Sequence, residues 1–215
     1  MLAVVIVPVA YYALCVAALA YLRYLPPPAT GIQLQRVAER WLEGEQPLRT
    51  YQWRAMDQVS PHLPRAVVAA EDARFFHHRG YDWQELRRAR ATARTAGAPM
   101  RGSSTLTHQL IKNLFFTTHR NPVRKAFEWA LTPPAEWILG KERILALYVN
   151  VVEFGPGIFG AEAAARHHYG IDAATLTRRE AMSLAAVLPA PLQRRPQEMD
   201  WYIEIIEERM NQLGW

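Results

Sequence analysis

Two adjacent carboxylates, Glu71 and Asp72, begin the segment whose residue types are best suited to acid–base chemistry. They follow an apolar helical pattern, and two negative charges at the C-terminal end of a helix are unfavourable beside the negative pole of its dipole. One interpretation makes Glu71 a general base, held in a cleft by the aromatic and histidine side chains that follow it. The alternative makes both residues surface charges paired with Arg74 or Arg79. This motif alone does not decide between the two.

A second segment, residues 101–113, combines a Gly-Ser-Ser turn with a helical pattern. Such a turn frees backbone N–H groups at the N-terminus of a helix, which favours anion binding. Thr105, Gln109 and Lys112 lie at i, i+4 and i+7 on one polar stripe, beside an apolar stripe formed by Leu106, Leu110 and Leu114. A helix of this kind suits a phosphorylated, sugar-bearing ligand. The alternative is an ordinary amphipathic helix with one solvated face.

A third segment adds basic residues around another carboxylate. Asn121 and Pro122 are typical of a helix start, and Arg124 and Glu128 then lie at i and i+4. This pattern could be a weak surface ion pair, or it could place Glu128 as a second functional acid among cations. Only three of the 25 basic residues are lysines, and all three fall inside motifs: Lys112, Lys125 and Lys141.

Taken together, these segments resemble the peptidoglycan glycosyltransferases of the lysozyme-like family, specifically the monofunctional biosynthetic transglycosylases. The likeness runs from about Val59 to Pro196 and rests on five motifs in the family's order. The matching residues are, along the chain, Glu71, Asp72, Phe75, His78 and Gly80; Gly102, Ser104, Thr105, Thr107, Gln109, Leu110, Lys112 and Asn113; Arg124, Lys125 and Glu128; Lys141, Ile144, Leu145, Tyr148, Asn150, Gly155, Gly157 and Gly160; and Glu180, Ala181, Leu184, Ala185, Pro189 and Pro191.

The resemblance implies an enzyme that polymerises lipid II into glycan strands and releases polyprenyl diphosphate. Glu71 would be the general base that takes the proton of the acceptor hydroxyl, and Glu128 a second catalytic carboxylate. The residues expected to bind the substrate and its diphosphate are Lys112, Arg120, Arg88, Ser104, Thr105, Gln109, Arg124 and Lys125. The resemblance implies no certain cofactor, and it leaves open a divalent cation, Mg²⁺ or Mn²⁺, shared by Glu128 and the phosphates. The expected partners are lipid II, the growing lipid-linked strand, the membrane and other cell-wall synthesis proteins, but not nucleic acid.

Three positions depart from the family pattern. His108 stands where the family usually has the first Gln of a pair, and Ala146 replaces a customary Glu. Pro133-Pro134 predicts an interruption of the helix after Glu128, because proline removes a hydrogen bond and clashes with the preceding turn. Two alternative functions are therefore a lysozyme-like glycan-cleaving enzyme and a catalytically weakened membrane scaffold of the cell-wall machinery. The cations favour synthesis over cleavage, since a cleaving enzyme gains nothing from a phosphate-binding cluster.

The N-terminal region is apolar. Residues 2–22 contain no charged side chain, and a helix of that length spans about 30 Å, the thickness of a bilayer core. We expect a retained single-pass anchor in the bacterial inner membrane, with the catalytic domain on the periplasmic face. A cleaved signal peptide is the alternative, because Ala18-Leu19-Ala20 has the form of a cleavage site. The lone cysteine, Cys15, excludes an intrachain disulfide and is expected to be inert.

The remaining sequence predicts a mostly α-helical fold: a lysozyme-like, two-lobed glycosyltransferase domain behind one transmembrane helix. Residues 1–24 would be the anchor, 25–50 a linker with a membrane-proximal helix, and 51–215 the catalytic domain. Residues 51–53 are a short extended candidate. Helices are expected over residues 30–44, 60–70, 83–95, 104–116, 122–139, 141–152, 159–169, 177–188 and 199–213. The formal charge of +5 suits several anionic partners and does not choose among them.

Overall fold

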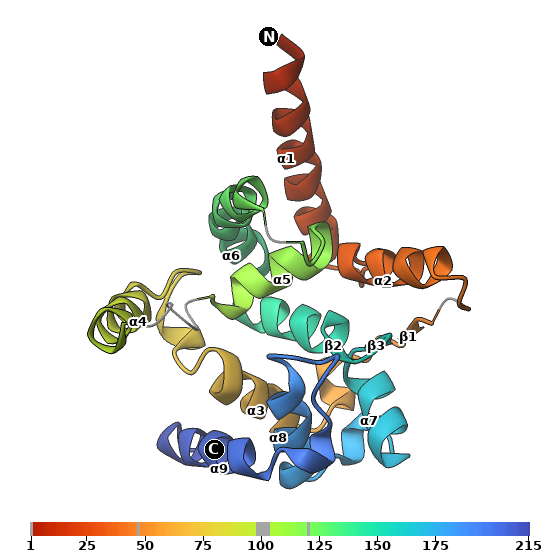
Figure 1. The fold of residues 1–215 in the computed structure, drawn as a ribbon, viewed down its shortest axis with the longest axis vertical. Coiled ribbons are helices and arrows are strands. Elements are labelled where there is room, and N and C mark those ends of the chain that lie inside the picture. The colour runs from red at the N-terminus through yellow and green to blue at the C-terminus, as the bar shows by residue number, and fades with distance from the viewer. Residues whose placement is uncertain (1, 47, 98–103, 120) are drawn as a thin grey trace.

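The computed structural model describes residues 2–46, 48–97, 104–119 and 121–215, and of residues 2–5 and 96 the backbone alone. This part of the chain is mostly helical, as predicted (Figure 1). Its helices are α1 (Leu2–Leu22), α2 (Gly31–Leu42), α3 (His62–Glu71), α4 (Trp83–Ala96), α5 (Leu106–Phe115), α6 (Pro122–Val151), α7 (Ala161–Tyr169), α8 (Arg178–Val187) and α9 (Asp200–Gln212). Its strands are β1 (Thr50–Tyr51), β2 (Glu153–Gly155) and β3 (Ile158–Phe159).

The helices form a core below α1. Figure 1 shows α1 extending from one end of the molecule, α9 at the other end, and α5 and α6 between them. Helix α3 packs against α8 and α9, and α5 packs against α6. The largest fully buried side chains are Tyr148, Phe75, Phe154 and Phe159. The cation of Lys141 lies 4.3 Å from the centre of the Phe75 ring and 2.9 Å from Glu136, so this third lysine of the motifs joins α6 to the core.

A small sheet closes one side of this core. Strand β3 lies in the middle, parallel to β1 and antiparallel to β2. The predicted extended segment at residues 51–53 is therefore a strand only at its first residue, because β1 ends at Tyr51. Gly160, which follows β3, has φ +83°, and a Cβ atom there would lie 2.2 Å from the carbonyl oxygen of Asn150. Only glycine permits this close approach of the sheet to α6.

Helix α6 corrects the expectation for Pro133-Pro134. The helix continues through both prolines and changes direction at Gly140, whose φ of 72° and ψ of 166° are not helical. The prolines lack the N–H groups that would bond to the carbonyls of Trp129 and Ala130, four residues earlier. Tyr81 Oη donates to the carbonyl oxygen of Trp129 at 2.6 Å, and Tyr12 Oη donates to that of Ala130 at 3.3 Å. Two tyrosines from other elements thus replace the missing donors.

Several helix boundaries follow from caps. Thr30 accepts a hydrogen bond from the backbone N–H of Gln33, whose side chain accepts from the N–H of Thr30, so this capping box starts α2 where a helix was expected, at residue 30. Three expected starts are wrong by one or two residues. The helix expected from residue 159 is α7, which begins at Ala161 because Phe159 belongs to β3. Thr105, and not Ser104, caps α5, and Ser60 does not cap α3, because its hydroxyl donates to the carbonyl oxygen of Leu176 at 2.7 Å.

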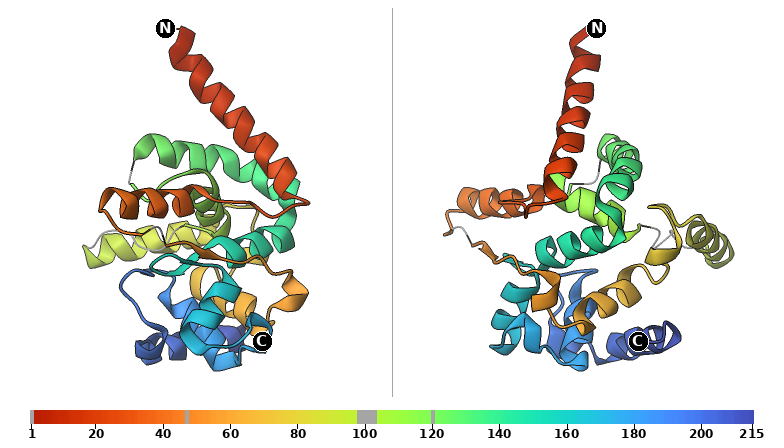
Figure 2. Two further views of the ribbon diagram at one scale, coloured as in Figure 1. Left: turned by 90° about the vertical axis from the view of Figure 1, so that its right-hand side faces the viewer. Right: turned by 180° about the vertical axis from the view of Figure 1, so that it is seen from behind.

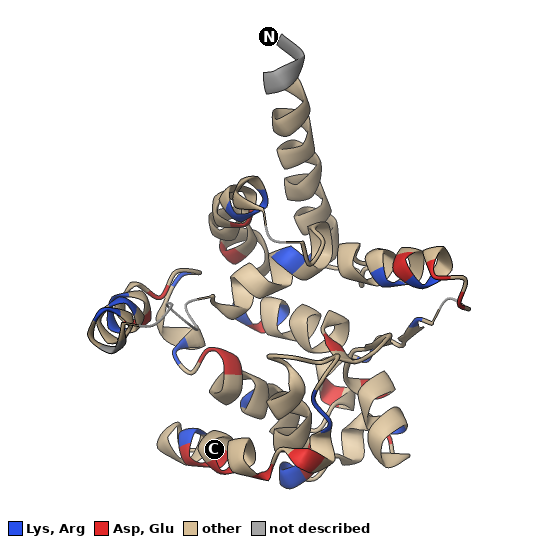
Figure 3. Ribbon diagram, viewed as in Figure 1, with Lys and Arg blue, Asp and Glu red and all other residues tan. Residues whose placement is uncertain are grey.

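Among its described side chains, the first helix contacts the domain from Tyr11 onwards. Leu19 is fully buried, and Tyr11 Oη donates to the carbonyl oxygen of Phe115 at 2.6 Å. Cys15 is also buried, in agreement with an inert thiol. Figure 3 shows no charged residue along the described length of α1. Among the residues that the structure describes, no helix combines the length and the apolarity needed to cross a membrane.

Candidate active site

Glu71 is the last residue of α3 and is held by a short chain of hydrogen bonds. Gln109 Nε2 on α5 donates to Glu71 Oε2 at 2.7 Å, and Tyr148 Oη on α6 donates to Gln109 Oε1 at 2.8 Å. Tyr148 is completely buried, so its hydroxyl fixes the orientation of the amide from inside the core. The amide then presents its N–H to the carboxylate.

The environment of Glu71 has opposing effects on its charge. Burial, the largest cause, raises the pKa of Glu71 above its ordinary value. The hydrogen bond from Gln109 and the positive charges of Lys112 and Arg194 partly oppose this rise, while Asp72 adds to it. A partly buried carboxylate of raised pKa that keeps a donor beside it can bind a proton during a reaction and release it afterwards.

Asp72 has a structural role. Its carboxylate accepts from the backbone N–H of Leu106 at 3.0 Å and lies 3.0 Å from Nε2 of His78. Asp72 therefore places its charge at the positive N-terminal end of α5 and connects that end to α3. The surface-pair interpretation of these carboxylates is wrong for Asp72, since Asp72 is buried and Arg74 pairs instead with Asp82 at 3.0 Å.

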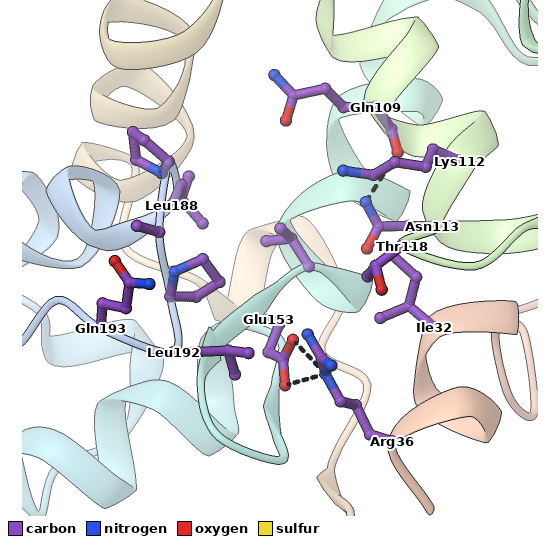
Figure 4. A pocket seen from close by; sticks show the side chains of 14 residues that line it. Ile32, Arg36, Gln109, Lys112, Asn113, Thr118, Glu153, Leu188, Leu192 and Gln193 are labelled. Carbon is purple, nitrogen blue, oxygen red and sulfur yellow. Dashed lines mark hydrogen bonds and ion pairs between the residues drawn. The ribbon is translucent and has the colours of Figure 1, made fainter. Parts of the chain in front are cut away.

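A cleft of about 320 Å³ lies beside this chain of hydrogen bonds. Figure 4 shows it between α5, α2, the β2 region and the loop after α8. The polar lining comes from Gln109, Lys112 and Asn113 on α5, with Arg36 and Glu153 on the opposite side. Arg36 Nε and Glu153 Oε2 form an ion pair at 3.1 Å. Gln109 therefore contacts Glu71 and also lines the cleft.

Three cations gather around Glu128, and we call Lys112, Arg124 and Lys125 the cation cluster. Glu128 is only 2% exposed, with Oε1 3.0 Å from Arg124 Nε and Oε2 3.0 Å from Lys125 Nζ. Burial lowers the pKa of Lys112, and the charges of Arg124 and Lys125 lower it further, whereas Glu128 and Glu71 raise it. The cluster carries three positive charges against one buried negative charge, which suits a polyanionic ligand.

The donor set around Glu128 does not fit a divalent cation. Oε2 accepts from Lys125 Nζ at 3.0 Å, and Oε1, which forms no hydrogen bond, lies 3.0 Å from Arg124 Nε, so both positive charges would repel a divalent cation bound there. Within the described residues, Asp72, His78 and Asp82 place ligand atoms within 4.8 Å of one another. Those atoms are used elsewhere, because Asp72 bonds to Leu106 and His78, and Asp82 bonds to Arg74 and the start of α4.

The structure does not bring every predicted residue to the cleft. Thr105 is buried and caps α5, since its Oγ1 accepts from the backbone N–H of His108 at 3.4 Å, and its hydroxyl donates to the carbonyl oxygen of Gly80 at 2.7 Å. Ser104 lies 3.4 Å from Lys125 Nζ at the edge of the cation cluster. Arg88 is exposed on α4 and 4.0 Å from Glu85, and it does not line the cleft. Arg120 lies outside the described residues.

Two departures from the family pattern are accommodated by packing. His108 packs against the rings of Tyr81 and Trp129, at centroid distances of 5.3 and 5.5 Å. Burial, helped by the charge of Lys125, lowers the pKa of His108 to about 4, so the imidazole is neutral and packs as an aromatic ring. Ala146 is buried, and its carbonyl oxygen accepts from Asn150 Nδ2 at 2.9 Å.

Sequence reasoning did not identify the supporting role of Tyr148 or the far wall of the cleft. Tyr148 is part of a motif, but nothing in the motif indicates that its hydroxyl contacts Gln109, 39 residues away. Arg36 and Glu153 are 117 residues apart, and no spacing pattern connects them. The loop at residues 188–193 forms a further wall, at the position of the fifth motif.

Comparisons with known proteins agree with the motifs. The family model described as Transglycosylase matches residues 39–213. A protein of Ectopseudomonas mendocina (strain ymp) named "Biosynthetic peptidoglycan transglycosylase" is 46% identical over 198 residues, covering 90% of this chain and 81% of that protein. Proteins of the same name from Caulobacter vibrioides and Pseudomonas aeruginosa are 42% and 40% identical, over 83% and 95% of this chain and 75% and 89% of their own lengths.

Proposed function

Because the chain belongs to the transglycosylase family and is a glycosyltransferase of peptidoglycan synthesis, we propose that it polymerises lipid II into glycan strands and releases polyprenyl diphosphate. One observation carries the proposal. Glu71, a partly buried carboxylate, is joined through Gln109 to a cleft lined by Lys112. This transfer requires a base close to a diphosphate-binding cation; Lys112 lines the cleft, and Glu71 adjoins the cleft through Gln109 without lining it.

In the proposed reaction, Glu71 takes the proton of the acceptor's 4-hydroxyl as that oxygen bonds to the anomeric carbon of the donor. The bond between that carbon and the diphosphate oxygen breaks, and the electron pair leaves with the diphosphate. A positioned base of this kind contributes about 100- to 10,000-fold. Gln109 orients the carboxylate, and its N–H favours the ionised form that accepts the proton.

The cation cluster would bind the leaving group. A diphosphate leaves as an anion and needs no proton, so positive charge alone can stabilise it. Lys112 lines the cleft, whereas Arg124 and Lys125 do not line it and pair with Glu128 on α6. Glu128 holds these two cations in place, which assigns it a positioning role. Arg120 and Ser104 remain candidate contacts, and other cell-wall synthesis proteins remain candidate partners.

We further propose that the N-terminal segment anchors the domain at the periplasmic face of the inner membrane. Along α1, large apolar side chains are exposed at Ile6, Val7, Val9 and Leu14. On α6, the exposed stripe Val123, Ala126, Ala130, Pro133 and Trp137 contains no polar residue. These surfaces support an anchor at residues 1–24, and with it we propose a linker at 25–50 and a catalytic domain at 51–215. Both substrates carry lipid chains and stay in the membrane, so the anchor keeps the cleft near them.

The test is polymerisation of purified lipid II by the full-length protein, followed on gels. Glu71→Gln should reduce polymer formation by about 100-fold or more, because the base is lost while the shape of the side chain is kept. Glu198→Gln is the matched control, since Glu198 is an exposed carboxylate 3.9 Å from Arg195. Near-normal polymer from folded Glu71→Gln would refute the assignment of the base. Fragments from preformed glycan strands, with no polymer from lipid II, would favour the glycan-cleaving alternative, and no product from either substrate would favour the scaffold.

A further inference from the structure

Helix α2 carries an apolar stripe that no described part of the chain covers. Leu34 is 59% exposed, Trp41 70% and Leu42 77%, and Ala38 between them is also exposed. These residues lie at i, i+4, i+7 and i+8, which is one face of an α-helix. Single exposed apolar residues are common on protein surfaces, but a continuous row along a whole helix is not.

The other face of α2 fixes the direction of this stripe. Ile32 is buried, and Arg36 reaches Glu153 on β2, with both side chains lining the cleft (Figure 4). At about 100° per residue, positions 34, 38 and 41 lie roughly 140–200° around the helix from position 36. The stripe therefore faces away from β2. In Figures 1 and 2 that is the side of the molecule from which α1 projects.

We propose that the stripe Leu34, Ala38, Trp41 and Leu42 lies on the surface of a lipid bilayer. The inference rests on the proposed anchoring of the N-terminal segment. Helix α2 runs across the direction of α1 (Figure 2), so a membrane entered by α1 would meet α2 side-on. Exposed Tyr21, Tyr24 and Leu25 continue the apolar surface from the base of α1. Tryptophan and tyrosine favour the membrane interface, and a helix with one apolar and one charged face binds there.

This arrangement has a consequence for the cleft. The same helix would face lipid with one side and the cleft with the other. An α-helix with its side chains is about 10 Å across, so the cleft wall formed by Ile32 and Arg36 would stand about that far from the lipid surface. A diphosphate could then bind in the cleft while the lipid chain attached to it stays in the bilayer. Helix α2 would thus set the height of the cleft above the membrane.

The experiment places single spin labels on the full-length protein in vesicles of phosphatidylethanolamine and phosphatidylglycerol. Cys15→Ala removes the natural thiol, and Leu34→Cys, Ala38→Cys and Leu42→Cys each report from the stripe. Glu43→Cys is the matched control, because Glu43 is exposed on the Arg36 side of the same helix. Leu14→Cys, at an exposed position on α1, reports on the anchor itself. Collisions with oxygen, which enters lipid, are compared with collisions with a nickel chelate, which stays in water.

The stripe labels should prefer oxygen, as the Leu14 label does, whereas the Glu43 label should prefer the nickel chelate. If the stripe labels prefer nickel while the Leu14 label prefers oxygen, the inference about α2 is wrong and the proposed anchor stands. If both prefer nickel, the anchor fails as well. Stripe labels shielded from both reagents would indicate a protein partner and overturn the proposal. Neither result bears on polymerisation in detergent, which tests the proposed chemistry separately.

Discussion

Tyr148 offers the sharpest test of the geometry around Glu71, because its hydroxyl can be removed with little change in shape. In Tyr148→Phe, Oε1 of Gln109 loses its donor at 2.8 Å in a part of the core where Tyr148 is fully buried. An unsatisfied buried acceptor costs about 1–3 kcal/mol. For a chain of this size each kcal/mol lowers Tm by about 2–4 °C, so the expected decrease is about 2–12 °C.

Tyr148→Phe should also reduce catalysis, because the Gln109 amide loses the hydrogen bond that orients it. Gln109 would no longer hold Glu71 in one position, and we expect kcat/KM to fall by about 10- to 100-fold, within the range that a general base contributes. The hydrogen bond from Gln109 lowers the pKa of Glu71, so weakening that bond raises it. Since the base must be ionised, the acid limb of the pH profile should move to higher pH. KM should change little, because Tyr148 does not line the cleft.

The assay is the initial rate of lipid II polymerisation across the pH range, together with a thermal melt. Tyr202→Phe is the control, because its hydroxyl donates to the carbonyl oxygen of Ala70, next to Glu71, at 3.3 Å and does not contact Gln109. A folded Tyr148→Phe protein with unchanged kcat/KM and an unchanged acid limb would show that Gln109 needs no support from Tyr148. A lower Tm alone would mean that the tyrosine is only structural.

Three further predictions concern stability. Burial raises the pKa of Glu71 in the folded state, so the ionised carboxylate destabilises the fold at any pH above the pKa of the unfolded chain. Glu71→Gln should therefore raise Tm at pH 8, by the equivalent of about 1.36 kcal/mol for each unit by which the pKa is raised. This gain in Tm should vanish near pH 4, where Glu71 is protonated in the folded state. Tyr81→Phe leaves the Trp129 carbonyl without its donor and should cost about 1–3 kcal/mol in urea unfolding; no change would mean that the proline segment of α6 needs no such bond. Glu128→Gln leaves two partly exposed cations without their counter-charge, and a loss of about 1.5–3 kcal/mol is expected on chemical denaturation, whereas an unaffected midpoint would contradict a stabilising role of these ion pairs.

Local signals predicted most helices, since periodicity and caps depend on residues close in sequence. The start of α2 at Thr30 and the buried stripe of α5 are examples. The same local rules failed at Pro133-Pro134. They could not include the hydroxyls of Tyr12 and Tyr81, which come from 118 and 48 residues away and replace the missing donors. Proline breaks a helix only where nothing else satisfies the exposed carbonyls.

For the candidate site, too, the sequence predicted which residues share a helix face but not the contacts between helices. Motif spacing placed Gln109 and Lys112 on one face of α5, and both line the cleft. Spacing could not show that Gln109 bridges Glu71 and Tyr148, because those contacts join three helices and span 38 and 39 residues. It also could not separate Thr105 from its neighbours on the polar stripe. The hydroxyl of Thr105 could have served either the fold or a ligand, and only the packed structure shows that it donates to the carbonyl oxygen of Gly80.

The surroundings of Glu71 also distinguish a base from an acid. A glycan-cleaving enzyme needs a protonated carboxyl to give a proton to a sugar oxygen, and burial of Glu71 by itself would suit that role. A protonated acid is best stabilised by acceptors, but the neighbour of Glu71 is a donor, the N–H of Gln109. Lys112, with its positive charge, also favours the ionised carboxylate. Burial therefore raises the pKa of Glu71, while the Gln109 donor and the Lys112 cation favour the ionised form that accepts a proton, which is the combination that a general base requires.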